Sequence, residues 1–392
     1  MILAGVGLSG NSITKSAARE ASERAAEGFG GARADFSIVF ATAEHGADLG
    51  DLVDVVAESS GSPYVVGCSA AGVLAADREI EEGAAIGVLS IRSDAVRATP
   101  FLFRDEGDNG LTAGLHVGQR LLASRDTNDV VLAWPDPFTV RPDRLLQGVD
   151  AVLGPVPVAG GAASSSLPSG GTFQFNGGDA GRACVSGLRL GGAFRHQVAL
   201  TQGCRPLGPP MTVTRAHENL ILEVDGIPAL TALRAAAPEH LFDDPDQALA
   251  ALTVAFLPEP EGSRVQGGEY LVRNIVAADP DTGVIAVAAE VEEGQSILFA
   301  QREAKAARED VERMASRAAR AAPPGGYAFG LYFDCLARGR SLYGCAGVDS
   351  HALARHLPGL PWLGFFCSAE IAPLRGANHL FTYTGVLVLF SE

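Results

Sequence analysis

The residues best suited to chemistry lie in two stretches, 63–74 and 361–373, that share one pattern. In each, an apolar run passes through a glycine and then reaches a cysteine and a serine. In the first stretch these residues are Gly67, Cys68 and Ser69. In the second they are Gly364, Cys367 and Ser368, followed by Glu370. Such a run is typical of a buried strand that carries polar groups at its end. We therefore interpret the two stretches as copies with functional groups at equivalent strand ends.

Glu370 and Arg338 supply opposite charges near the second strand end. An arginine can bind a carboxylate through two hydrogen bonds, so the pair could recognise a small zwitterion. A structural salt bridge that closes the domain is the alternative. We expect Cys335 to lie beside them, with Cys68 and Ser69 at the equivalent place in the other half. Asn378, a few residues after Glu370, is a secondary candidate.

The cysteines also suggest a second class of function. A catalytic or redox-sensing thiol needs a lowered pKa, and Arg338 follows Cys335 closely enough to lower it. However, Cys335, Cys68 and Cys367 come at or near the ends of apolar runs, where cysteine usually acts as a small buried side chain. No histidine is placed by sequence to act as a base. Binding is therefore favoured over a cysteine-dependent enzyme or redox sensor.

Two short motifs resemble cofactor and hydrolase signatures. The segment 5–10 matches the G-x-G-x-x-G pattern, but no acidic residue ends the next strand at the distance that a dinucleotide site requires. The segment 67–72 resembles a nucleophile elbow, yet its second glycine is one residue too late. A strand end of small residues explains it better. The sequence contains no Cys-x-x-Cys pair and no metal-ligand spacing, so we expect neither cofactor nor metal.

Composition limits the class of partner and the compartment. The chain has 392 residues and a formal net charge of −16, with no clustered lysine and arginine surface, which argues against a nucleic-acid partner. No apolar run is long enough to cross a membrane, and the N-terminus lacks a signal-peptide pattern. The six cysteines show no disulfide framework. These features predict a cytoplasmic protein.

The order of apolar and helical patterns repeats along the chain. A strand, a helix, a second strand ending in 63–74, a loop and a closing strand in the first half recur in the second half around 361–373, and a weaker copy lies near 129–166. We predict an α+β fold of duplicated strand-helix-strand-loop-strand units, with mixed sheets flanked by helices and two related lobes. The seam between the lobes is expected near 191–203, where glycines interrupt the strands.

Several segments in combination resemble one family, the FIST proteins. They are the segments 5–9, 67–72, 203–210, 219–229, 335–339 and 364–373. The resemblance covers nearly the whole chain and implies a FIST N-terminal domain over 1–200 and a FIST C-terminal domain over 201–392. It also implies a sensory protein for a small ligand, proposed to be an amino acid or related metabolite. Any output is then expected to pass to a separate signalling protein, unless the protein acts alone. An interaction scaffold is the alternative. Where the family has glycine, this chain has Ala369, which narrows the space available to a ligand.

Overall fold

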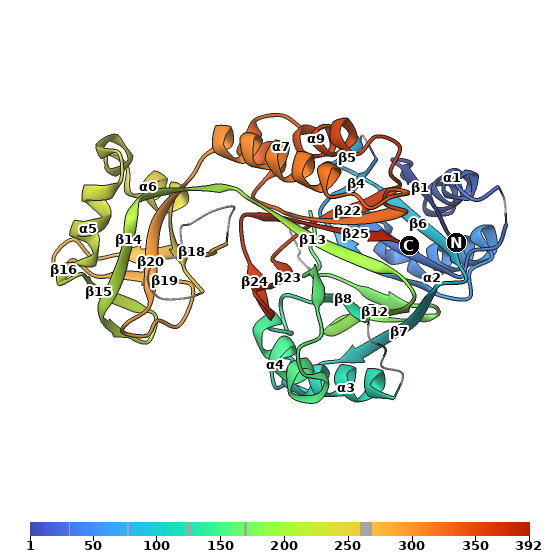
Figure 1. The fold of residues 1–392 in the computed structure, drawn as a ribbon, viewed down its shortest axis with the longest axis horizontal. Coiled ribbons are helices and arrows are strands. Elements are labelled where there is room, and N and C mark those ends of the chain that lie inside the picture. Colours follow the sequence, from blue (N-terminus) through green and yellow to red (C-terminus); the bar gives the residue numbers. More distant parts are fainter. Residues whose placement is uncertain (31, 77, 124–125, 127, 168–170, 259–268) are drawn as a thin grey trace. The chain divides into compact units, whose positions relative to one another are not determined.

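The computed structural model describes residues 1–30, 32–76, 78–123, 126, 128–167, 171–258 and 269–392. The chain forms two compact units (Figure 1). The first unit comprises residues 1–200, 311–380 and 384–392, and the second comprises 201–310 and 381–383. The predicted α+β fold with mixed sheets and flanking helices is confirmed.

Three copies of one strand pattern build the first unit. In each copy an edge strand lies beside a returning strand, which pairs antiparallel with the first of two parallel strands. In order from the edge, the strands are β1 (Ile2–Ser9), β6 (Ile86–Ser93), β2 (Phe36–Thr42) and β3 (Val65–Ala70) in the first copy; β7 (Val96–Arg104), β12 (Cys184–Gly192), β8 (Val130–Pro135) and β9 (Val158–Gly161) in the second; and β13 (Arg195–Gln202), β25 (Thr384–Ser391), β21 (Phe329–Cys335) and β22 (Trp362–Cys367) in the third. The sequence repeat is therefore a threefold repeat of sheets.

Helices join these strands at matching places. Helices α1 (Thr14–Glu27), α3 (Leu111–Leu122) and α7 (Ala304–Arg320) precede the first parallel strand of each copy, and α2 (Leu49–Ser60), α4 (Pro142–Leu153) and α9 (Val348–His356) join the two parallel strands. A short helix, α8 (Gly339–Tyr343), comes before α9. This order matches the strand-helix-strand pattern that the sequence predicts.

Each copy gives a short hairpin to the sheet of another copy. The hairpins are β4 (Val73–Ala75) with β5 (Arg78–Ile80), β10 (Gln174–Asn176) with β11 (Asp179–Gly181), and β23 (Glu370–Leu374) with β24 (Ala377–Phe381). They pair with β22, β3 and β9, respectively. Each sheet therefore contains the four strands of one copy and the hairpin of another, so no copy forms its sheet alone.

A glycine at the same place in each second parallel strand explains the pattern in the sequence. A Cβ at Gly67, Gly160 or Gly364 would lie 1.7, 2.0 or 2.1 Å from the carbonyl oxygen opposite it on the neighbouring strand. Only glycine permits that approach. Gly364 therefore has a packing role in the core.

Aromatic side chains from equivalent strand positions meet in the centre of the first unit. Phe40, Trp134 and Phe333 occupy the same register position in β2, β8 and β21. The Phe40 ring lies 5.4 Å from Trp134 and 6.4 Å from Phe333, in edge-to-face arrangements that aromatic pairs favour. All three are buried. The core of the unit is thus shared by the three copies.

Glycines in the opening motif also serve packing. A Cβ at Gly5 or Gly7 would lie 1.9 or 2.0 Å from a carbonyl oxygen of α1, whose alanine face is buried against β1. Strand β1 pairs antiparallel with β6 and continues into α1, so the segment 5–10 brings helix and strand together. This close approach accounts for its glycines without a dinucleotide.

The second unit contains one seven-stranded sheet. Its strands, in order, are β14 (Cys204–His217), β20 (Ser296–Arg302), β17 (Leu252–Phe256), β18 (Leu271–Ala278), β19 (Ile285–Val287), β15 (Leu220–Val224) and β16 (Ile227–Pro228). Because β14 also pairs with β15, the sheet closes on itself. Helices α5 (Ala229–Ala236) and α6 (Pro245–Ala251) contribute buried side chains to its apolar core.

No helix in the described part of the chain is long and apolar enough to span a membrane.

Candidate functional site

The ends of β21 and β22 carry a group of buried polar residues. The two strands are parallel, and their last residues, Cys335 and Cys367, lie opposite one another. Carboxyl ends of parallel strands are the usual location of ligands in open α/β sheets. We call the following residues the carboxyl-end cluster: Asp334, Cys335, Arg338, Asp349, Cys367 and Glu370.

Arg338 is fully buried and is held mainly by Asp349. Its Nη2 and Nε lie 2.8 and 3.1 Å from Asp349 Oδ2, and its Nε lies 2.9 Å from Asp334 Oδ1. Tyr332 and Tyr343 donate their hydroxyl hydrogens to Asp349 at 2.6 and 2.8 Å. Burying this cation is costly, and the charge and hydrogen bonds of Asp349 offset that cost. The network fixes the start of α9 against β21.

Glu370 begins β23 and is also fully buried. The Thr384 backbone N–H donates to its Oε2 at 3.1 Å, and the Cys367 thiol lies 3.5 Å from its Oε1. Burial raises the pKa of Glu370 to about 8. At neutral pH this carboxyl group therefore keeps its proton. The sequence analysis treats Glu370 as a negative charge, and burial is the physical reason why its carboxyl group is neutral instead.

Asp334 resembles Glu370 in this respect. Burial raises the pKa of Asp334 well above its usual range, the charge of Asp349 raises it further, and Arg338 acts in the opposite direction. The cluster therefore combines the Arg338 cation and its partner Asp349 with two carboxyl groups whose pKa values are raised by burial. An added positive charge would favour ionisation of both groups.

Two buried polar atoms in the cluster have no hydrogen-bond partner among the described residues. They are Nη1 of Arg338, a donor, and Oδ2 of Asp334. A buried polar atom without a partner costs about 1–3 kcal/mol, more when it is charged, so such atoms are uncommon in native folds. A ligand that offers both an acceptor and a donor would satisfy the two atoms together.

The outer layer of the cluster is formed by two chain bends. Leu336 is 40% exposed and follows Cys335, while Ser368 is exposed and follows Cys367. The Ser368 hydroxyl donates to Ala163 O at 2.9 Å. The cluster thus lies one residue beneath the surface.

The buried thiols lack the environment that a nucleophile needs. Burial raises the pKa of Cys367 and of Cys68 well above the usual value for a thiol. A raised pKa removes the thiolate, which is the reactive form. These two cysteines therefore have the properties of buried structural residues.

Of the predicted residues, the structure brings Arg338, Glu370, Cys335 and Cys367 into one cluster. Arg338 and Glu370 do not form a direct ion pair, because the partners of Arg338 are Asp349 and Asp334. The sequence analysis missed both aspartates. Asp334 interrupts the apolar run of β21 and could have been noticed, whereas nothing in the spacing of Asp349 indicated that it meets Arg338.

Other predicted residues lie outside the cluster. Asn378 accepts from Val158 N at 2.8 Å and donates to Val156 O and Asp150 at 2.9 and 3.0 Å, so its amide fixes the turn before β9. Cys68 lies in β3 opposite Gln174 and is buried.

Two serine hydroxyls join the three second parallel strands near their carboxyl ends. The Ser69 hydroxyl donates to Ser164 O and accepts from Phe173 N, both at 3.1 Å. The Ser164 hydroxyl in turn accepts from Ala71 N at 2.8 Å and donates to Phe366 O. The hydroxyls of Ser69 and Ser164 therefore hold the three copies together at this end of the core.

Comparison with known proteins identifies the family. The model of the FIST N domain matches residues 35–227, and that of the FIST C domain matches 229–373. The chain belongs to the FIST family, whose domains are of the sensory, small-ligand-binding type.

Full-length relatives are known in mycobacteria. The chain is 31% identical over 389 residues to "Uncharacterized protein Rv0628c" of Mycobacterium tuberculosis, covering 99% of both chains. It is 31% identical over 390 residues to "Uncharacterized protein Mb0898c" of Mycobacterium bovis, covering 99% of this chain and 98% of that protein. A crystal structure of cyanuric acid hydrolase from A. caulinodans aligns with 49% of this chain and 71% of its own at 12% identity, with a TM-score of 0.26.

Proposed function

We propose that this chain is a cytoplasmic sensor that binds an amino acid or a related metabolite at the carboxyl-end cluster. The observation that carries the proposal is the pair of buried atoms without partners, Nη1 of Arg338 and Oδ2 of Asp334. An amino acid has a carboxylate to accept from the first and an ammonium group to donate to the second. Binding would satisfy both atoms at once.

The raised pKa values of two carboxyl groups give this binding a chemical signature. A ligand ammonium group beside Asp334 and Glu370 would stabilise their ionised forms and lower their pKa values. At neutral pH, ionisation of Glu370 on binding would then release a proton to the solvent. A neutral ligand of the same shape would cause no such release.

Access to the cluster requires the outer bends to move. Arg338 and Glu370 are fully buried, so the segments 336–337 and 368–369 must open before a ligand can enter. Arg338 also contacts Asp349 at the start of α9, which couples the ligand to that helix. A ligand that binds only the opened arrangement shifts the population toward it, and this shift is the signal passed to a separate signalling protein.

A thermal-shift screen of the full chain against amino acids and related metabolites tests the proposal. A ligand at 100 times its dissociation constant stabilises the fold by about 2.7 kcal/mol, which is readily seen as a rise in melting temperature. We expect a shift with at least one amino acid and none with its decarboxylated or deaminated analogue. Equal shifts with the analogues, or no shift with any compound, would contradict the proposal.

A further inference from the structure

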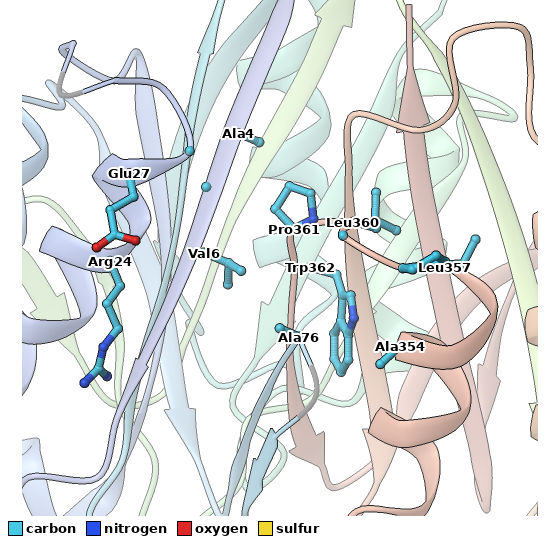
Figure 2. A pocket seen from close by; sticks show the side chains of 14 residues that line it. Ala4, Val6, Arg24, Glu27, Ala76, Ala354, Leu357, Leu360, Pro361 and Trp362 are labelled. Atoms are coloured by element: carbon cyan, nitrogen blue, oxygen red, sulfur yellow. The ribbon is translucent and has the colours of Figure 1, made fainter.

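A second feature of the first unit is a groove along the edge strand β1 (Figure 2), and its lining contains no residue of the carboxyl-end cluster. Its volume is about 700 Å³. One wall is β1 with the end of α1, and the other is the end of α9 with the start of β22, where Leu357, Leu360, Pro361 and Trp362 form an apolar surface. The groove has the dimensions of a binding site.

The backbone of β1 faces this groove with open hydrogen-bonding groups. In an antiparallel ladder, alternate residues direct N–H and C=O away from the partner strand. Ile2 N–H donates to Glu392 and Leu8 C=O accepts from Arg24, so the even-numbered residues face away from β6. Ala4 and Val6 lie between them and line the groove. Their outward groups form no hydrogen bond with any described residue.

Nothing in the sequence of β1 protects this edge. Natural edge strands usually carry charges, proline or a bulge that prevents pairing with another strand. The eight residues of β1 are ILAGVGLS, and their register with β6 is continuous. An uncharged, regular edge whose middle residues, Ala4 and Val6, direct backbone groups outward without a hydrogen bond to the described residues is a template for an added strand.

The pseudo-equivalent edge in the second copy is protected. Val6 lies opposite Leu89, and Pro100 of β7 lies opposite Leu188 at the matching register position. Proline has no N–H to offer a neighbouring strand. A groove of about 670 Å³ also borders β7, lined in part by Arg97. Two grooves of similar size therefore differ in whether a strand can pair with their edge.

We propose that the β1 groove binds an extended peptide segment of a partner protein as an added β-strand. Ala4 and Val6 would form the backbone hydrogen bonds, and alternate apolar side chains of the peptide would pack against Trp362 and Leu360. Arg24 and Glu27 both line the groove, so its lining carries one positive and one negative charge beside the apolar surface.

The test begins with a display library of short random peptides. Peptides that bind the full-length wild-type protein are selected from it. Selected peptides are synthesised and titrated by fluorescence polarisation against wild type, Val6→Pro and Val6→Ala. Val6→Pro removes an outward N–H while keeping the ladder with β6, and Pro100 shows that this fold accepts proline at that position. Val6→Ala shortens the side chain and keeps the backbone groups.

We expect selected peptides with alternating apolar residues, bound at least about tenfold more weakly by Val6→Pro than by Val6→Ala. The melting temperatures of the variants serve as the folding control. Amide exchange at Val6 should slow when peptide binds to wild type. Equal peptide affinity for the two variants, no protection at Val6, or a library that yields no peptide sensitive to Val6→Pro would overturn the proposal.

Discussion

The Arg338 guanidinium and the Asp349 carboxylate form an ion pair 2.8 Å apart, with side-chain exposures of 0% and 1%. Asp349 also accepts from two tyrosine hydroxyls, whereas Nη1 of Arg338 has no partner among the described residues. The guanidinium is therefore held through Nε and Nη2, while Nη1 can still donate a hydrogen bond to a ligand. This arrangement can be structural and ligand-binding together.

Removing the charge of Asp349 should strongly destabilise the first unit. Asp349→Asn leaves a buried cation without its main partner, and we expect a loss of about 3–5 kcal/mol in the free energy of unfolding. The matched control is Arg355→Ala, which breaks the exposed pair with Glu312 and should cost about 0–1 kcal/mol. Urea unfolding measures both. Equal effects of the two variants would show that the buried pair contributes little.

Stability should fall as pH rises because of Glu370. Its pKa rises from 4.5 to about 8 on folding, so the folded state binds the proton more tightly than the unfolded state. The resulting stabilisation is fully present below pH 4.5 and is lost as pH rises to about 8. Glu370→Gln cannot ionise, so the difference in melting temperature between variant and wild type should grow in the variant's favour over this range. A constant difference would contradict the raised pKa.

Ser164 should be important for joining the three copies. Ser164→Ala leaves Ala71 N–H and Phe366 C=O without the hydroxyl that links them, at a cost of about 1–3 kcal/mol. Ser166→Ala is the control, because Ser166 is exposed. Chemical denaturation of both variants gives the comparison. A Ser164→Ala protein as stable as the control would mean that the bridge is dispensable.

Thiol labelling should distinguish buried from exposed cysteines. Cys345 is exposed, whereas Cys68 and Cys367 are buried with raised pKa values. Iodoacetamide treatment of the native protein, followed by mass spectrometry, should therefore modify Cys345 well before the other two. Rapid modification of Cys367 would instead indicate a reactive thiol in the carboxyl-end cluster, as a cysteine-dependent enzyme or redox sensor requires.

The sequence predicted the repeat because packing acts locally on the strands. Gly67 and Gly364 lie where a side chain would clash with the backbone of the neighbouring strand. Glycine is therefore required at both positions, and its recurrence is recognisable in the sequence. The copy around Gly160 was also detectable, although a longer loop follows it. The exchange of hairpins between copies could not be predicted, because it depends on which distant strand edge each hairpin meets.

The candidate site was predictable only in part for the same reason. Arg338, Glu370 and the two cysteines lie at strand ends, which the apolar pattern marks. Asp349 reaches Arg338 through the fold, and a pairing across 11 residues that include the short helix α8 and a change of direction before α9 has no periodic signal. The neutral state of Glu370 depends on its complete burial. The residues next to Glu370 in the sequence do not show that it is buried.

Affinity for an amino acid that shifts the melting temperature, compared in wild type and Glu370→Gln at neutral pH, tests the central claim most directly. The variant keeps the shape of the side chain but cannot ionise in response to a ligand ammonium group. We predict at least a tenfold loss of affinity by calorimetric titration, about 1.4 kcal/mol, with stability at neutral pH retained and with proton release on binding reduced. Unchanged affinity together with a lowered melting temperature would show that Glu370 is structural and that the ligand binds elsewhere.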